Sequence, residues 1–172
     1  MTGAPQDTPI RVLFLCTANS ARSQIAEALL ARRAGRRFVV ASAGTNPARE
    51  IHPEAIVALQ KVGIEWAGRV PKGIDGVRDT LWDFIITTCD RLTETCPAFP
   101  GQPIYAHWSV PDPAPATGQA KAFSETVSLL SWRIDLMLAL RPELLNRAAA
   151  EQRLRSIGIE APADVAQPLA GD

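Results

Sequence analysis

The chain has 172 residues, which fits one compact domain, and its 18 basic and 18 acidic side chains give a formal net charge of zero. This balance excludes a global attraction to nucleic acid or to an acidic membrane, and no apolar run reaches the ~20 residues that a membrane-spanning helix requires. Residues 1–9 lack a signal-peptide pattern and the chain has only three cysteines, so we expect a cytoplasmic protein with reduced thiols.

The first half of the chain alternates between short apolar runs and stretches with helical spacing. An apolar run of β-forming residues predicts a strand buried on both faces, and apolar residues three or four positions apart predict a helix. In chain order these patterns give a strand at 11–15, a helix from 23 that ends at Gly35, a strand at 38–41 and a helix at 53–62.

The second half repeats this alternation after a mixed segment at 68–83, near whose end we expect only a short helix. The patterns then predict a strand at 84–88, an irregular loop at 92–101, a strand at 103–108, and helices at about 120–140 and 142–157.

Alternating strands and helices predict an α/β fold. We expect a single domain over residues 10–158, with a four-stranded parallel sheet flanked by helices on both faces, and flexible tails at 1–9 and 159–172. In such sheets the ligand site lies beyond the carboxyl ends of the strands. Three chemically capable residues fall at or shortly after such ends, namely Cys16, Cys89 and Asp112.

The most informative stretch is the loop that follows the first strand. A thiol, Cys16, stands at the end of this buried strand, and Arg22 follows six positions later, where a helix begins. A loop of this length can turn its backbone N–H groups inward, and the helix N-terminus and the guanidinium add positive charge. We expect a cradle for a doubly charged tetrahedral anion, formed by Thr17, Ala18, Asn19, Ser20, Ala21, Arg22 and Ser23.

The same field predicts a lowered pKa for Cys16 and a nucleophilic thiolate at neutral pH. Ser23 is placed to donate a hydrogen bond to the sulfur, and Asn19 tolerates a left-handed backbone and can tie the loop to neighbouring strands. Spacing alone leaves a plainer interpretation open, in which Cys16 is a buried core thiol and Arg22 a solvated helix residue.

Three segments carry a resemblance to a known family. The string at 12–30 reads VLFLCTANSARSQIAEALL. It resembles the low-molecular-weight protein tyrosine phosphatase fold family and, within it, the arsenate reductases. The segments 42–45 (SAGT) and 107–114 (HWSVPDPA) are similar to the family's second strand and loop and to the segment that holds its general acid. The resemblance covers roughly residues 10–140, so the last predicted helix is extra to it.

The resemblance implies a first step that phosphatases and reductases share. Cys16 attacks the central phosphorus or arsenic atom, Arg22 holds the equatorial oxygens, and Asp112 protonates the departing oxygen. Water then completes a phosphatase reaction, whereas reduction of arsenate to arsenite takes two electrons from thiols. The segment from Cys89 to Cys96 resembles the reducible loop of thioredoxin-coupled arsenate reductases. It implies a relay in which Cys89 attacks Cys16, and Cys96 then attacks Cys89.

The resulting hypothesis is an arsenate reductase of arsenic detoxification, with phosphate or sulfate as competing oxyanions. It implies no bound cofactor or metal and an external thiol reductant, either thioredoxin or glutathione with glutaredoxin. Phosphotyrosine enzymes of the family that the sequence resembles typically place tyrosines just after the Asp-Pro pair, where they grip an aryl ring. Here Ala114, Pro115 and Ala116 follow instead, which favours a small inorganic anion over an aryl phosphate. The single tyrosine of the chain, Tyr105, agrees with this preference.

Two alternative functions stay open. A phosphatase acting on phosphotyrosine or small phosphomonoesters would use Cys16, Arg22 and Asp112, while Cys89 and Cys96 protect the nucleophile from overoxidation. A non-catalytic oxyanion-binding or redox-sensing module would bind anions without turnover. The residues alone also permit Cys89 to be a buried strand-end thiol and Cys96 an incidental loop thiol.

Some reductases of this family bind potassium beside the loop through Asn, Glu, Ser and Asp side chains. Asn19, Glu27 and Ser42 occupy the matching positions, but Lys72 stands where the aspartate falls. Our hypothesis is that the Lys72 ammonium replaces the ion electrostatically and so supports the loop.

The two histidines do not predict a zinc site, which needs about four ligands. We expect His107, beside Trp108, to be structural, and His52 to lie at the surface or to cap the helix that begins at Pro53.

Overall fold

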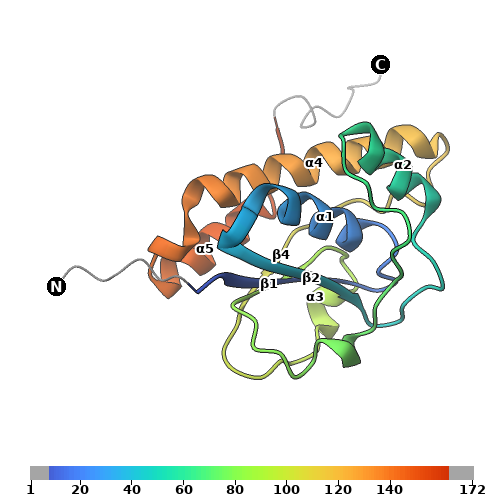
Figure 1. Cartoon of the computed structure of the whole chain (residues 1–172). Helices are drawn as coiled ribbons and strands as arrows, with labels where there is room; N and C mark the ends of the chain where they lie inside the picture. Colours follow the sequence, from blue (N-terminus) through green and yellow to red (C-terminus); the bar gives the residue numbers. More distant parts are fainter. Residues whose placement is uncertain (1–7, 163–172) are drawn as a thin grey trace, which may run out of the picture.

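The computed structural model describes residues 8–162, in which a four-stranded parallel sheet forms the centre of the molecule (Figure 1). The strands are β1 (Ile10–Cys16), β2 (Phe38–Gly44), β3 (Phe84–Thr87) and β4 (Ile104–His107). They lie in the order β2-β1-β3-β4, and every neighbouring pair is parallel. The predicted fold class, an α/β domain built on four parallel strands, is confirmed.

Four helices share the larger apolar core on one face of the sheet (Figure 1). They are α1 (Arg22–Ala34), α2 (Pro53–Lys61), α4 (Gln119–Leu140) and α5 (Arg147–Ile157). A short 3-10 turn, Gly35–Arg37, follows α1. The burial of Phe123, Val127, Leu130 and Ile134 confirms the apolar stripe predicted for the longest helix.

The opposite face of the sheet is covered by less regular chain. Its smaller apolar cluster includes residues of the 3-10 turn Ile74–Gly76 and of the short helix α3 (Leu92–Thr95). In Figure 1, α3 lies on the side of the sheet away from α1 and α4. All three cysteines belong to this cluster or pack against it. The thiols therefore gather on the face that the long helices leave free.

Two short helices lie where the sequence patterns did not predict them. In the segment 68–83 the helical turn is Ile74–Gly76, in the middle rather than near the end, because Ile74 packs against the sheet. The loop predicted at 92–101 begins with α3, whose single turn is held by a hydrogen bond from Thr95 Oγ1 to the Arg91 carbonyl at 2.8 Å. Four residues are too few to display helical spacing in a sequence.

The helix predicted at 142–157 is two elements. A 3-10 turn, Pro142–Leu144, is followed by α5, which begins at Arg147. The side chain of Asn146 accepts a hydrogen bond from the N–H of Ala149 at 2.9 Å. This N-cap starts a new helix and explains the break.

Parallel pairing brings the chemically important strand ends to one edge of the sheet. Cys16 pairs with Gly44 across β1 and β2, and Leu15 pairs with Thr87 across β1 and β3. Beyond that last pair, the N–H of Thr88 donates to the Leu15 carbonyl at 2.8 Å, so the chain continues beside β1 toward the second cysteine. The first two cysteines therefore leave the sheet from adjacent strands.

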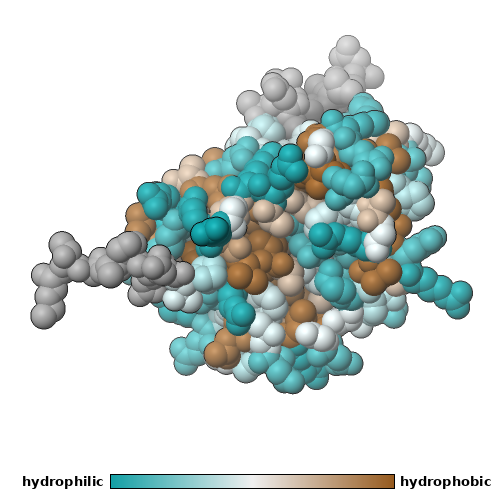
Figure 2. Space-filling model, viewed as in Figure 1, coloured by the Kyte–Doolittle hydropathy of each residue, from teal (hydrophilic) through white to brown (hydrophobic). Residues whose placement is uncertain are grey.

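On the face drawn in Figure 2, hydrophobic residues occur in small groups among hydrophilic ones. No helix within residues 8–162 is long and apolar enough to cross a membrane. The flexible tails predicted at 1–9 and 159–172 lie largely outside the described residues, and the domain limits of 10–158 stay a prediction.

Candidate active site

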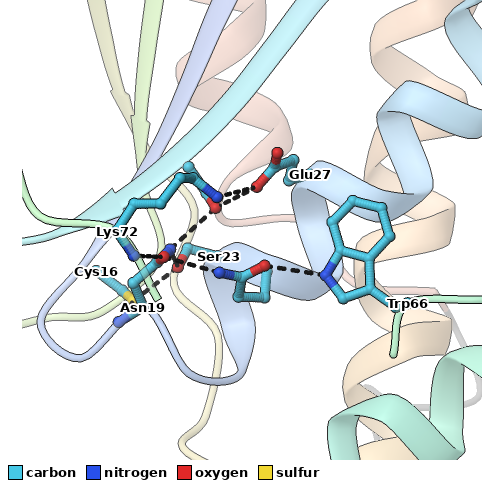
Figure 3. Close-up of polar contacts among 8 residues, drawn as sticks. Cys16, Asn19, Ser23, Glu27, Trp66 and Lys72 are labelled. Carbon is cyan, nitrogen blue, oxygen red and sulfur yellow. Dashed lines mark hydrogen bonds and ion pairs between the residues drawn. The ribbon is translucent and has the colours of Figure 1, made fainter. Parts of the chain in front are cut away.

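Cys16, the nucleophile expected from the sequence, is the last residue of β1 and only 4% exposed. Its sulfur lies 2.8 Å from Ser23 Oγ and accepts a hydrogen bond from the N–H of Asn19 at 3.0 Å (Figure 3). The segment 16–23, which we call the anion loop, therefore folds back over its own first residue. The thiol lies at the base of this loop.

The segment after β2 orients the backbone of the anion loop. Four loop carbonyls accept hydrogen bonds of 2.8–3.2 Å from N–H groups of residues 45–52. They are the carbonyls of Cys16, Thr17, Ala18 and Ser20. Because C=O and N–H point in opposite directions across a trans peptide plane, the N–H groups of the same planes point into the loop. Inward N–H groups at the start of a helix can cradle an anion.

Gly44, at the end of β2, lets these two segments approach closely. A Cβ atom on this residue would lie 2.5 Å from the carbonyl oxygen of Thr17 and 2.9 Å from the backbone nitrogen of Asn19. Both are main-chain atoms of the anion loop, which cannot swing aside as a flexible side chain can. The observed loop geometry therefore requires glycine at position 44.

Asn19 holds the anion loop from the inside. Its backbone adopts a left-handed φ of 50°, and its side chain is fully buried. The side-chain nitrogen donates to Ser23 Oγ and Ser42 Oγ, both at 2.9 Å (Figure 3). The side-chain oxygen accepts from Gln24 Nε2 and from the N–H of Lys72, both at 2.8 Å. Asn19 thus uses all four side-chain hydrogen-bonding positions to tie the loop to α1, β2 and the chain before β3.

Sequence reasoning missed two members of this network, Gln24 and Trp66. Trp66 Nε1 donates to Gln24 Oε1 at 2.9 Å, and the Gln24 amide in turn donates to Asn19 (Figure 3). Gln24 is fully buried in the first turn of α1. Trp66 lies in a stretch without a regular pattern, so no spacing in the sequence signals the pair.

Burial governs the ionisation of Cys16. Loss of water raises the pKa of Cys16 above the ordinary thiol value, although hydrogen bonds from Ser23 and Asn19 oppose the rise. The predicted lowering is therefore wrong for the free protein, because desolvation costs the thiolate more than these donors return. A nearby thiol, Cys89, adds to the rise.

Arg22 and Asp112 lie together beside the anion loop. Arg22, the first residue of α1, donates from Nη1 to the Val110 carbonyl at 3.1 Å, and its Nη2 lies 3.8 Å from Asp112 Oδ2. The Arg22 side chain is 17% exposed, so it is not a freely solvated helix residue, whereas the Asp112 side chain is 51% exposed. A guanidinium that belongs to the anion loop and a solvent-reaching carboxyl group therefore stand next to each other.

The other two cysteines lie along the chain after β3, and Cys89 contacts the anion loop. Cys89 is 2% exposed, and its sulfur lies 3.4 Å from Oγ1 of Thr17, a residue of the loop. Cys96 follows α3 and is partly buried, and its thiol contacts the Pro97 carbonyl at 3.6 Å. Burial also raises the pKa of Cys96. All three cysteines are free thiols.

A histidine ties the start of the Cys89 segment to the end of β4. His107 Nδ1 lies 2.7 Å from Thr87 Oγ1, and its Nε2 lies 2.9 Å from Asp90 Oδ1. Ser109 Oγ donates to the same carboxylate oxygen at 3.1 Å. These contacts, chiefly the one with His107, hold the pKa of Asp90 below its ordinary value. His107 thus has a structural position between two strand ends.

The residues matched to the potassium site form a different arrangement. The Lys72 ammonium lies 3.2 Å from Glu27 Oε2, and Ser42 Oγ donates to the same carboxylate oxygen (Figure 3). Ser42 also accepts from Asn19. Since a side-chain cation already pairs with the carboxylate that would hold the ion, these residues do not fit a potassium site.

Within residues 8–162, no group of three or more His, Cys, Asp and Glu side chains could hold a metal ion. His52 caps α2, because its Nδ1 accepts a hydrogen bond from the N–H of Glu54 at 3.1 Å.

Comparison with known sequences places this geometry in a family context. Residues 11–150 match the family described as low molecular weight phosphotyrosine protein phosphatase. Arsenate reductases from Halalkalibacterium halodurans and Bacillus subtilis are each 36% identical to the chain over 107 residues, which cover 62% of this chain and 76% of each relative.

Solved structures give the same result. An arsenate reductase in the phosphate binding state has a TM-score of 0.67 and 27% identity, covering 76% of this chain and 98% of that one. A thioredoxin-dependent arsenate reductase from Corynebacterium glutamicum has a TM-score of 0.61 and 32% identity, covering 77% and 62%. Since the family match runs from β1 through α4, the chain belongs to the low molecular weight phosphotyrosine protein phosphatase family.

Proposed function

We propose that this protein reduces arsenate to arsenite by a three-cysteine relay and serves arsenic detoxification. The observation that carries the proposal is the place of the second thiol: Cys89 lies 3.4 Å from a side chain of the anion loop, on the same face of the sheet as Cys16 and Cys96. Hydrolysis of a phosphate ester needs no second thiol there, whereas reduction of the anion does. Relatives named arsenate reductase support this assignment.

The first step uses the anion loop. Its inward N–H groups and Arg22 bind the arsenate oxygens. Cys16 passes its proton to an oxygen of the bound arsenate dianion, and the resulting thiolate attacks arsenic. An arsenic–sulfur bond forms while an arsenic–oxygen bond breaks, and the departing oxygen takes a proton from Asp112. The arsenic atom stays in its +5 state at this point, so this half of the reaction is common to phosphatases and reductases.

The second step transfers the electrons. Cys89 attacks the sulfur of Cys16, a disulfide forms, and the electron pair of the arsenic–sulfur bond stays on arsenic, which leaves as arsenite. Cys96 then attacks Cys89 and frees Cys16. An external dithiol reduces the remaining Cys89–Cys96 disulfide, and we propose thioredoxin for this role, with glutathione and glutaredoxin as the alternative. Such thiols stay reduced in the cytoplasm, which we propose as the compartment.

Phosphate ester hydrolysis is the second candidate, because the geometry of Cys16, Arg22 and Asp112 suits it equally. The scarcity of tyrosine, which would grip an aryl ring, favours the small inorganic anion instead. Tyr105, the only tyrosine in the sequence, accepts a hydrogen bond on its hydroxyl from the N–H of Phe99 at 3.1 Å, so it is engaged within the chain after Cys96. We therefore expect any hydrolysis of aryl phosphates to be a side reaction.

The test is arsenate-dependent oxidation of NADPH in the presence of thioredoxin and thioredoxin reductase. It compares the wild type with Cys16→Ser, Cys89→Ser and Cys96→Ser, with aryl phosphate hydrolysis measured on each. A parallel assay supplies glutathione and glutaredoxin instead. We expect each substitution to abolish steady reduction and only Cys16→Ser to abolish hydrolysis.

Without a reductant the variants separate the relay steps. Cys96→Ser is expected to release about one arsenite per protein and to stop with a Cys16–Cys89 disulfide, whereas Cys89→Ser releases none. Reduction that does not depend on Cys89 would contradict the relay. Hydrolysis without reduction would identify a phosphatase, and anion binding without turnover under every reductant would identify a non-catalytic module.

A further inference from the structure

The segment that leads from β4 to Asp112 is held by two arginines on two different helices. Arg22 of α1 donates to the Val110 carbonyl at 3.1 Å. Arg133 of α4 donates from Nη1 to the neighbouring Ser109 carbonyl at 2.7 Å. Two consecutive carbonyls just before the expected proton donor are therefore fixed by charged groups from the helical face.

This segment has little freedom to bend between those carbonyls and the carboxyl group. Asp112 is flanked by Pro111 and Pro113, whose rings fix φ. Val110 and Asp112 each precede a proline, which restricts both to extended conformations. The position of the Ser109 and Val110 carbonyls therefore largely determines where the backbone places Asp112.

Arg133 connects this segment to the C-terminal end of the described chain. Its Nε and Nη2 both donate to the Glu160 carbonyl, at 3.2 and 3.1 Å. Arg133 is 4% exposed, and within residues 8–162 it forms no ion pair with a carboxylate. A buried cation that meets only carbonyl groups is costly, and an apolar side chain would fill the space at lower cost. The guanidinium of Arg133 does what an apolar side chain could not, because it links the Ser109 carbonyl to the Glu160 carbonyl.

Helix α5 packs against the same strand end. Trp108 Nε1 donates to the Leu154 carbonyl at 3.0 Å. A Cβ atom on Gly158 would overlap the carbonyl oxygen of His107, so the end of α5 lies directly on the backbone where β4 stops. The family match ends at residue 150, so most of this contact lies outside the matched region.

We propose that the C-terminal extension, residues 146–160, sets the position of Asp112 through Arg133, which is a positioning residue for proton transfer by that carboxyl group. The inference rests on the role proposed above for Asp112. Displacement of the extension releases the Ser109 carbonyl and lets Asp112 move from its place beside Arg22. The backbone of the anion loop is left intact, because its carbonyls are bound by N–H groups of residues 45–52. Arg22, which donates to the Val110 carbonyl, keeps its own place as the first residue of α1.

The experiment uses the whole chain and three variants of this bridge. Arg133→Met removes every donor, Arg133→Lys keeps the charge but can reach only one of the two carbonyls well, and Gly158→Ala pushes α5 off His107 without changing Arg133. Arg153→Ala, at an exposed position of α5, is the control. The readouts are single-turnover arsenite formation, kcat/KM for aryl phosphates and the Kd of inorganic phosphate.

Arg133→Met and Gly158→Ala are expected to slow arsenite formation about tenfold or more, part of what a general acid contributes. Arg133→Lys should lie between Arg133→Met and the wild type, Arg153→Ala should equal the wild type, and phosphate Kd should stay constant in all. With aryl phosphates, the loss should be larger for phenyl phosphate than for 2,4-dinitrophenyl phosphate, whose leaving group departs without a proton. Should Arg133→Met fail to fold, Gly158→Ala and Arg133→Lys still decide the question.

A double-mutant cycle with Asp112→Asn separates positioning from general structural support. We expect Arg133→Met to cause no further slowing in the Asp112→Asn background. An equal loss in both backgrounds, an equal loss for both aryl phosphates, or a matching loss of phosphate affinity would overturn the inference. If the wild type hydrolyses aryl phosphates but forms no arsenite, the proposed function fails, while the same cycle on hydrolysis still decides this inference.

Discussion

The anion loop and the segment 89–96, which carries the second and third thiols, leave the same edge of the sheet from adjacent strands but are held very differently. The anion loop is bound through four of its carbonyls, through the buried Asn19 network and through the close approach of Gly44. The segment 89–96 has one helical turn and the exposed Asp90–His107 contact.

This difference follows from the chemistry proposed for each region. Stabilisation of an oxyanion requires donors that are already in place, because donors that must reorient lose much of their effect. Thiol exchange among three sulfurs instead requires one of them to travel, which is easier where local structure opens at low cost. The proposed chemistry therefore requires rigidity of the anion loop and mobility of the segment 89–96, and the two segments touch through Thr17 and Cys89.

The largest effect is expected from a substitution that disturbs the anion loop. Gly44→Ala is expected to weaken inorganic phosphate binding about 100-fold or more, because the new Cβ displaces backbone atoms of the anion loop. Calorimetric titration with phosphate measures this. Gly73→Ala is the matched control, since a Cβ there would meet only Pro47 at an ordinary 3.6 Å. Equal affinity in the two variants would show that the loop does not depend on this contact.

A smaller effect is expected at the sulfur itself. Ser23→Ala removes a donor to Cys16 and so raises the pKa of that thiol further. The thiolate fraction falls at every pH below that pKa, and we expect alkylation by iodoacetamide at neutral pH to slow about tenfold. The rate is followed against pH in a background of Cys89→Ser and Cys96→Ser. An unchanged profile would mean that the hydroxyl does not donate to the sulfur.

The segment 89–96 is tested through the exposed Asp90–His107 contact. Asp90→Ala is expected to speed hydrogen exchange in residues 89–96 by at most about fivefold, because an exposed contact of this kind is weak. Exchange in the anion loop should not change, and Asp75→Ala, at another exposed carboxylate, should affect neither region. Faster exchange in both regions would contradict their independence.

The same contact predicts a pH dependence with a definite sign. His107 and Ser109 hold the pKa of Asp90 below its ordinary value, so the contact is fully formed above the ordinary carboxyl range. It is lost as pH falls through the lowered pKa. After correction for the intrinsic pH dependence of amide exchange, protection in residues 89–96 of the wild type should therefore fall on acidification toward that of Asp90→Ala. A constant difference between the two proteins at every pH would show that ionisation of the carboxylate is not needed.

The smallest effect is expected from potassium. Because the Lys72 ammonium pairs with Glu27, potassium chloride should activate the wild type no more than choline chloride at the same ionic strength. Arsenate turnover by Lys72→Ala should be a few-fold lower than that of the wild type, because a partly exposed ion pair contributes only modestly. Potassium should restore part of this turnover. Specific activation of the wild type by potassium would contradict the replacement of the ion.

Much of this molecule follows from residue patterns. The buried strand β1 and the apolar face of α4 can be predicted from the sequence, because buried positions are occupied by apolar residues in a regular pattern. The spacing of Cys16 and Arg22 likewise predicts a loop at a strand end. All four predicted strands are present in the sheet.

The remaining features depend on contacts between segments far apart in the chain. The buried Gln24 reads as a solvent-facing helix residue until Trp66 and Asn19 are placed beside it. The pKa of Cys16 depends on how completely the fold excludes water, which no local motif reports. Arg133 is an ordinary helical arginine in the sequence, and only the packing of α5 makes it a bridge.

Because β1 and β3 are neighbours, a side chain at the end of one strand lies beside the nucleophile at the end of the other, although the two are far apart in the sequence. Under the relay proposed above, a scaffold of this topology that already binds an oxyanion gains redox chemistry from one cysteine after β3 and another within reach of the first, on a segment that can open. The neighbouring strand ends thus offer a place where hydrolysis and reduction can share one anion site.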